Sequence, residues 1–455
     1  DLFVTAIEGI NEFYRNDGGM NFTNISSTIG FFQTDLFTYG TSFGDIDNDG
    51  DLDAFISNRT STEELQRNYL YRNDEGTFID ITSSAGIPIE DENGNENSQL
   101  SFCTIFFDFN KDGFQDIYLA NDKTNNINRN ANANMVAKTI FMITLFFMPL
   151  VILSSGLVDA PLVLFLLYVI SGLGMAGIGM SVMHDAIHGS YSKNKKINTF
   201  LGYSFNLIGG SAVIWKIQHN ILHHTYTNID EADDDLNAPF FLRFSPHAKH
   251  YWVHQFQHIY IWFFYSISTI SWITSKDFVR LKRYKNMGFF DKKNEYEKTL
   301  AAMIAWKLLY YSYALILPMI MLPFSWGMIL VAFLCMHFVT GFLVSIIFQI
   351  AHIMPSTEFP LPNKNGEMKE CWYGHQLATT TNFSPNNKFL YWLIGGLNYQ
   401  VEHHLLPDVC HVHYKDISKI VATTAEEFGM KYHVKSSLFQ AISAHTKMLR
   451  SLGKK

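Results

Sequence analysis

The sequence predicts a mainly α-helical membrane protein, with four transmembrane helices and a histidine-rich cytosolic cap, preceded by a small β-rich segment. Three observations support this prediction. Four apolar runs approach or exceed the roughly 20 residues that a helix needs to cross the hydrocarbon layer. All 18 histidines lie at or after residue 184. Charge also divides the chain, because residues 1–131 are strongly acidic and residues 132–455 are basic.

The N-terminal segment, residues 1–131, is distinguished by its charge and by an internal repeat. It carries 23 acidic and 7 basic side chains, whereas the rest of the chain carries 19 and 27. The stretches that begin at Phe13 and Asp45 recur in modified form at Leu70 and Asp108, which are 57 and 63 residues later. Offsets of this size are typical of one structural unit that occurs twice.

The repeated acidic stretch, DIDNDGDLDAF in its first copy, has the ligand spacing of a calcium loop. Side-chain oxygens alternate around a glycine, which suits the hard Ca²⁺ ion, but the final glutamate of an EF-hand is missing. The stretch resembles the calcium loops of FG-GAP and VCBS β-propeller repeats, and this resemblance implies two cation sites. The expected calcium ligands are Asp45, Asp47, Asp49 and Asp53 in the first loop, and Asp108, Asn110, Asp112 and Asp116 in the second.

Two such repeats are too few to close a β-propeller, which needs at least about four blades. They would leave open strand edges and little core. We therefore interpret residues 1–131 as incomplete propeller blades, truncated or chimeric, joined to a separate membrane domain at residues 132–455. A genuine fusion of the two domains is the alternative.

Four apolar runs dominate the second domain. Core helices of soluble proteins seldom run this long without charge, so we expect each run to span a membrane. The two loops within the helical hairpins lack Lys and Arg, whereas the central segment is rich in both, so the positive-inside rule places the central segment in the cytoplasm. Two weaker stretches, 200–215 and 259–273, are expected to be interfacial. The expected spans are 136–155, 161–183, 301–322 and 324–350.

Eight histidines cluster at the cytoplasmic ends of these spans. Pairs spaced four apart share one face of a helix, as in MHDAIH and HNILHH. Imidazole suits iron, copper and zinc, and eight nitrogens are too many for one tetrahedral zinc, so they indicate two metal ions. No H-E-x-x-H motif supplies the general base of a zinc protease. The expected ligands are His184, His188, His219, His223, His224, His352, His403 and His404.

The motifs HDAIH, HNILHH and QVEHH resemble the three histidine boxes of the membrane fatty acid desaturases. The resemblance covers about residues 132–455 and is strongest to the front-end branch, of the acyl-lipid or linoleoyl-CoA type. It implies a non-haem di-iron site on the cytoplasmic face that uses O2 and two electrons to remove two hydrogens from a fatty acyl chain. It also implies that the seven box histidines and His352 bind iron. Gln400, where many relatives have histidine, and His375 are expected to lie beside the ligands.

The expected partners follow from the same resemblance. The substrate is a fatty acyl-CoA or acyl-lipid, and no nucleic acid is expected. No His-Pro-Gly-Gly haem motif is present, so electrons are expected from a separate donor, a ferredoxin or a b-type cytochrome. The basic run 276–298 suits docking of an acidic carrier, and equally suits a topology signal. Two other functions stay open: a fatty acyl hydroxylase on the same scaffold, and a calcium-dependent surface adhesion module anchored in the membrane.

Overall fold

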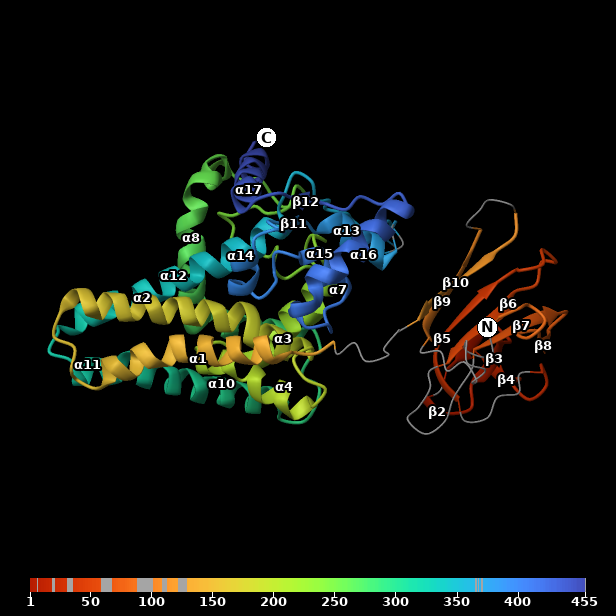
Figure 1. The fold of residues 1–455 in the computed structure, drawn as a ribbon, viewed down its shortest axis with the longest axis horizontal. Coiled ribbons are helices and arrows are strands. Elements are labelled where there is room, and N and C mark those ends of the chain that lie inside the picture. The colour runs from red at the N-terminus through yellow and green to blue at the C-terminus, as the bar shows by residue number, and fades with distance from the viewer. Residues whose placement is uncertain are drawn as a thin grey trace. The chain divides into compact units, whose positions relative to one another are not determined.

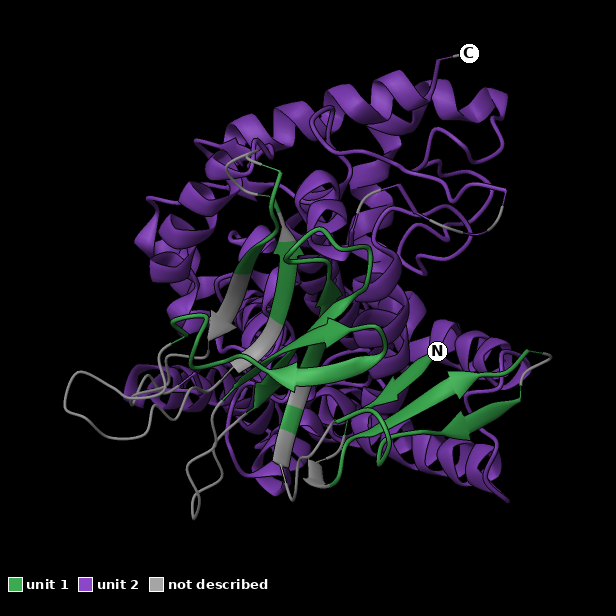
Figure 2. Cartoon of the chain, turned by 90° about the vertical axis from the view of Figure 1, so that its right-hand side faces the viewer, with its two compact units in different colours: residues 1–128 green, residues 129–455 purple. Residues whose placement is uncertain are grey.

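The computed structural model divides the chain into two compact units, residues 1–128 and residues 129–455 (Figures 1 and 2). The structure describes all residues except 6, 19–20, 31–35, 59–67, 88–100, 109–112, 122–128, 365, 367, 370 and 455. Each unit is considered by itself below.

The first unit consists of short, mostly antiparallel strands. One sheet has the order β1-β3-β4, with β1 at Leu2–Val4, β3 at Glu12–Asn16 and β4 at Phe22–Asn24. A second has the order β2-β5-β6-β7-β8, and β9 pairs with β10 in a third. These strands are Ile7–Gly9, Leu36–Gly44, Asp53–Asn58, Tyr69–Asp74, Thr77–Asp80, Ser101–Phe107 and Asp116–Asn121. The predicted small β-rich segment is confirmed.

The first acidic loop joins β5 to β6 and is stabilised by local hydrogen bonds. The carboxylate of Asp45 accepts hydrogen bonds from the backbone N–H groups of Asp49 and Gly50, both at 3.1 Å. The buried carboxylate of Asp53 accepts two backbone N–H groups at 2.7 and 2.8 Å, and burial raises its pKa. Short polar side chains commonly stabilise turns in this way. Calcium binding by Asp45, Asp47, Asp49 and Asp53 stays a prediction, as does binding by Asp108 and Asp116; Asn110 and Asp112 lie outside the described residues.

Four long helical segments form the membrane bundle of the second unit, and each is long and apolar enough to cross a membrane. The four expected spans are confirmed, and the second and fourth extend further than expected, so that they end at His188 and His352. The first is α1 (Ala133–Ser154), and the second joins α2 (Pro161–Gly177), η1 (Ile178–Val182) and α3 (Met183–His188). The third joins α10 (Glu295–Tyr311), η5 (Ser312–Ile316) and α11 (Leu317–Met321), and the fourth is α12 (Trp326–His352).

Glycines allow these helices to approach one another closely. A Cβ atom at Gly174 of α2 would lie 2.4 Å from the backbone nitrogen of Phe146 in α1. A Cβ atom at Gly172 would lie 2.6 Å from the backbone oxygen of Met336 in α12. Small residues at helix crossings are a common means of packing in membranes, where van der Waals contact replaces the hydrophobic effect. The second span is therefore held tightly between the first and the fourth.

Most of the remaining helices form a cap at the end of the bundle where α3 ends (Figure 1). Helix α8 (Gln257–Ser271) instead lies along the fourth span, where Thr269 donates a hydrogen bond to the backbone oxygen of His337. Segment 200–215 forms short helices, whereas segment 259–273 is part of a continuous helical stretch over residues 257–286; neither is among the four candidate spans. Between the second and third spans lie α4 (Lys195–Gly202), α5 (Ser204–Leu207), α6 (Ala212–Trp215), η2 (Lys216–His223), α7 (His224–Tyr226), η3 (Trp252–Phe256), α8 (Gln257–Ser271), η4 (Trp272–Lys276) and α9 (Asp277–Asn286). After the fourth span lie α13 (Trp372–Thr379), β11 (Asn382–Phe383), α14 (Lys388–Leu393), α15 (Gln400–Leu405), η6 (His411–His413), α16 (Tyr414–Glu427), β12 (Val434–Lys435) and α17 (Leu438–Leu452).

Candidate metal centre

The first histidine pair lies at the C-terminal end of the second span. Helix α3 continues through the HDAIH motif and ends at Gly189, which adopts a left-handed conformation with φ of 79°. His184 and His188 are therefore one turn apart on one face, with ring centroids separated by 4.8 Å. The predicted shared face is confirmed.

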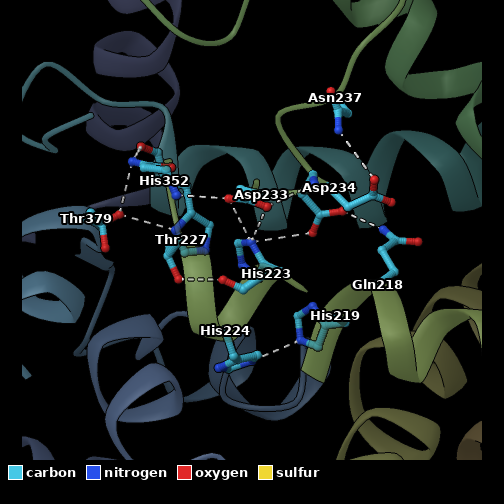
Figure 3. Close-up of polar contacts among 12 residues, drawn as sticks. Gln218, His219, His223, His224, Thr227, Asp233, Asp234, Asn237, His352 and Thr379 are labelled. Atoms are coloured by element: carbon cyan, nitrogen blue, oxygen red, sulfur yellow. Dashed lines mark hydrogen bonds and ion pairs between the residues drawn. The ribbon is translucent and has the colours of Figure 1, made fainter. Parts of the chain in front are cut away.

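The second histidine group lies on the π-helical segment η2 and the turn that follows it. In a π-helix the hydrogen bonds run from i to i+5, so residues five apart come onto one face. The Nε2 atoms of His219 and His224 accordingly face each other at 3.3 Å (Figure 3). The rings of His219 and His223 stack with centroids 5.3 Å apart. This local widening brings all three imidazoles together, whereas a regular α-helix would separate His219 from His224.

The eight expected ligands converge in the structure. His352 ends α12, while His403 and His404 lie on α15, and all are buried. The ligand nitrogens of His184, His188, His219 and His403 lie within 4.8 Å of one another. A second group with the same spacing contains His223, His352 and His404, and a third contains His224, His403 and His404. The imidazoles thus form two neighbouring groups with His224 between them.

In four of these imidazoles, the two ring nitrogens differ in their hydrogen bonding in the same way. In each, Nδ1 meets a protein partner, while the buried Nε2 has no hydrogen-bond partner among the described residues. The four Nδ1 contacts are His223 to Asp233 at 3.0 Å, His352 to the backbone oxygen of Thr379 at 3.3 Å, His403 to the hydroxyl of Tyr414 at 3.2 Å, and His404 to Oε1 of Gln376 at 2.9 Å.

A bonded Nδ1 beside an unpartnered Nε2 fits a metal centre. A buried nitrogen without a partner costs about 1–3 kcal/mol, so four of them in one cluster require compensation. Metal-binding histidines typically direct one nitrogen at the ion and use the other for a hydrogen bond that fixes the ring. The donor set, made of nitrogen ligands alone, suits iron, copper or zinc. The residues present therefore fit a centre that holds two metal ions.

Electrostatics favour the metal-binding form of most of these rings. Burial, followed by repulsion from neighbouring imidazoles, holds the pKa values of His219, His224, His403 and His404 well below their usual range. These imidazoles are therefore neutral. His223 differs because Asp233 outweighs the effect of burial and raises the pKa of His223 to about 9. At neutral pH the metal-free ring therefore carries a proton on each nitrogen. Asp233 holds the proton on Nδ1, and a metal ion that binds at Nε2 must displace the other.

Asp233 is expected to control metal retention through His223. Both carboxylate oxygens face Nδ1 of His223, at 3.0 and 3.1 Å (Figure 3). The Asp233→Asn variant keeps the size of the side chain but removes its charge, so we expect metal affinity to fall about 10-fold or more. Chelator competition on the purified protein measures this change. Glu231→Gln, an exposed acid on the same loop, is the control, and equal affinity in both variants would contradict the role of Asp233.

Two residues expected beside the ligands have different surroundings. Gln400 is fully buried, and its amide has no hydrogen-bond partner among the described residues. The Nε2 atom of His375 bonds the backbone oxygen of Thr227 at 2.8 Å. The neighbouring Gln376 instead reaches a ligand ring, that of His404. The roles of Gln400 and His375 stay predictions, and Gln376 is an addition that sequence reasoning missed.

An apolar cavity lies beside the first imidazole group. It is lined on one side by Met183, Trp215 and Phe348. Trp215 stacks on His219 with ring centroids 4.3 Å apart, and Phe348 lies edge-on to the same imidazole at 5.7 Å. The cavity continues between the spans to Thr269 and Thr340. Its apolar lining suits an apolar chain segment that lies beside the imidazoles.

A smaller, more polar cavity lies against the second imidazole group. It is lined by His223, His352 and the acidic pair Asp233 and Asp235, and it shares Phe348 with the larger cavity. The ring of Phe348 therefore lies between an apolar space and a polar one, next to both groups of imidazoles.

Comparison with known proteins gives consistent results. A family model described as fatty acid desaturase matches residues 159–436. The sn-1 linoleoyl-lipid 6-desaturase of Synechocystis is 34% identical over 326 residues, which is 71% of this chain and 89% of the relative. The corresponding enzyme of Arthrospira platensis is 33% identical over 62% of this chain and 76% of its own length. The acyl-lipid (8-3)-desaturase of Physcomitrium patens is 33% identical over 73% and 69%. All eight histidines lie within the matched range.

Proposed function

The chain belongs to the fatty acid desaturase family, and we propose that it introduces a double bond near the carboxyl end of a fatty acyl chain carried on a membrane lipid. The observation that carries this proposal is the convergence of eight histidines, seven buried and His188 half-buried. Four of the eight hold a bonded Nδ1 and an unpartnered Nε2. An adhesion module merely anchored in the membrane has no use for such a cluster.

The two imidazole groups supply a ligand set for each of two iron ions. His184, His188, His219 and His403 would hold one ion, and His223, His352 and His404 the other, with His224 between them. When bound, two iron ions would activate O2 for removal of hydrogen from an unactivated C–H bond. Gln400 is buried on the same short helix as His403 and His404, so its amide is available to a bound water or to the second ion.

The proposed reaction balances with an external source of electrons. One O2 accepts two hydrogens from adjacent methylenes, together with two electrons and two protons from outside, and leaves as two water molecules. We propose that the electrons come from a separate ferredoxin or b-type cytochrome that docks on the cytoplasmic face. The protein's own contribution is to hold the acyl chain, fix the imidazoles and exclude water.

The apolar cavity is the proposed site of the acyl chain. Trp215 and Phe348 contact the imidazoles and also line the cavity, so a chain in the cavity has a methylene segment beside the cluster. An acyl tail offers no hydrogen bonds, and this lining requires few. The names of the matched relatives support a lipid-bound substrate, and the 6-position in two of these names supports a double bond near the carboxyl end.

Expression of the whole chain in a host with a competent electron donor tests the proposal. We expect a new unsaturated fatty acid in the membrane lipids, with the double bond on the carboxyl side of any existing one. Mass spectrometry of the lipid classes identifies both the position and the carrier. A hydroxylated product would support the hydroxylase alternative, and an unchanged lipid profile with iron bound and donor present would overturn desaturation.

A further inference from the structure

A chain of three buried polar side chains links the first span to the first histidine pair. Lys138 of α1, only 3% exposed, places Nζ 2.8 Å from Nε2 of His411 in the cap. Nδ1 of the same imidazole lies 2.7 Å from Oδ2 of Asp185 in α3. The other carboxylate oxygen, Oδ1, lies 3.5 Å from Nδ1 of His184. Three segments that are distant in sequence thus meet directly behind one expected metal ligand.

The chemistry of lysine fixes the direction of these hydrogen bonds. An ammonium group only donates, so Nε2 of His411 must accept from Lys138. The proton of the neutral ring then lies on Nδ1, which donates to the carboxylate of Asp185. The charges therefore alternate from the Lys138 ammonium through a polarised imidazole to a carboxylate, and both ring nitrogens of His411 are satisfied.

A metal ion bound by Asp185 and His411 themselves would explain these contacts less well. Asp185, Cys410 and His411 place their ligand atoms close together. However, Oδ2 of Asp185 already accepts from the thiol of Cys410 at 3.0 Å and from His411. The Lys138 ammonium on the far side of the ring would also repel a cation. The group is thus a completed hydrogen-bond network rather than an additional metal site.

His184 lacks the Nδ1 hydrogen bond that four of the other expected ligands have. The rings of His223, His352, His403 and His404 each have an Nδ1 partner, whereas both ring nitrogens of His184 lack one within normal hydrogen-bond distance. The nearby acceptor is Oδ1 of Asp185, and contacts from the cap to Oδ2 determine where Oδ1 lies. Carboxylates behind metal-binding histidines orient the ring and raise its basicity.

We propose that Lys138, His411 and Asp185 act as a positioning chain that orients His184 and sets its strength as a metal ligand. This inference rests on the proposed function only in that His184 binds a metal ion. Lys138 connects the first span to the cap through His411, which also bonds Asp185. Its removal would leave Nε2 of His411 without a donor and would release the constraint on the carboxylate.

The chain offers a matched control in a second buried lysine. Lys307 lies in the third span, is 5% exposed, and pairs with Asp277 at 2.9 Å without contacting any of the clustered histidines. Lys307→Met therefore imposes a similar loss of a buried charge pair. Any effect specific to the metal centre must appear in Lys138→Met and be absent from Lys307→Met.

The experiment titrates the metal-free, full-length protein with Co²⁺, whose visible absorption reports the ligand field. We expect two sites in the wild type. In Lys138→Met and in His411→Gln, we expect one site to bind about 10-fold more weakly with an altered absorption band. Because both residues act through one carboxylate, the double variant should match the single variants rather than add their effects. Lys138→Arg, which keeps a cationic donor, should recover part of the affinity.

The outcomes separate this inference from the proposed function. Lys138→Met and His411→Gln could lower thermal stability as Lys307→Met does while Co²⁺ affinity and absorption stay at wild-type values. That result would show a purely structural role and overturn the inference. Failure of Lys138→Met to fold leaves His411→Gln to decide. A wild-type protein that binds no Co²⁺ at the cluster would instead overturn the proposed function.

Discussion

The His403→Ala variant is expected to lose desaturation by more than about 100-fold and to lose bound iron with it. His403 is a member of two of the three nitrogen groups, so it lies close to the residues that would hold each of the two proposed ions. Removal of a residue that only hydrogen-bonds a metal ligand typically lowers metal affinity or activity about 10–100-fold. Removal of a ligand itself should therefore have a larger effect. The measurements are iron per folded protein and the unsaturated fraction of the host lipids.

A buried histidine outside the cluster provides the matched control. His445 is fully buried and bonds the hydroxyl of Tyr265 at 2.8 Å and the backbone oxygen of Ile353 at 2.9 Å. His445→Ala should therefore lower thermal stability, because it leaves both partners unsatisfied, while iron per folded protein stays at the wild-type level. Equal loss of iron in both variants would attribute the His403 effect to folding alone.

The membrane spans and the ligand histidines could be predicted because each is encoded locally. Hydropathy over about 20 residues identifies a span without knowledge of its neighbours. Histidines four apart at the end of such a run share a helix face, as His184 and His188 do. Their expected placement on one side of the membrane follows from the order of the spans. Their convergence also depends on the π-helical segment η2, which brings His219 and His224 together.

The partners of these imidazoles could not be predicted, because they come from distant or irregular segments. Asp233 belongs to an acidic run that directly follows the second histidine box. No periodic pattern in the sequence predicts that this loop folds back so that Asp233 contacts His223. Gln376 reaches His404 from a separate helix. The π-helical turn that joins His219 to His224 also leaves no pattern in the sequence, because its hydrogen bonds are set by tertiary packing.

Lys138 illustrates how a local reading can identify a feature without explaining it. In the sequence it is a charge that interrupts an apolar run, and only the fold supplies its partner, His411, which is 273 residues away. The acidic loops show the opposite case, in which a local sequence pattern suggests a function that the pattern alone does not establish. Their spacing suggests calcium, but the described carboxylates of Asp45 and Asp53 already bond backbone amides, so spacing alone does not separate a cation site from a turn.

The Gly179→Leu variant is expected to change which acyl chains the protein accepts. Gly179 lines the apolar cavity from the π-helical segment η1, and a Cβ atom there would meet nothing within 4 Å. The leucine side chain therefore enters the space proposed for the acyl tail. This distinguishes Gly179 from Gly172 and Gly174, where a Cβ atom would collide with the backbone of a neighbouring span.

The expected effect depends on chain length. Each methylene that a filled pocket excludes is worth about 1–3 kcal/mol, which corresponds to about 10–200-fold in specificity. We therefore expect desaturation of the longest acceptable chain to fall at least about 10-fold relative to a chain two to four carbons shorter. The ratio of the two unsaturated products, measured in one host, reports this change independently of the amount of protein.

Gly327→Leu is the matched control for that ratio. Gly327 lies in the first turn of α12 and also has open space at Cβ, but it does not line the cavity. A general disturbance of the bundle would lower both products in either variant and leave their ratio unchanged. A shift of the ratio in Gly179→Leu alone means that the tail occupies this cavity, whereas an unchanged ratio with full activity means that it lies elsewhere.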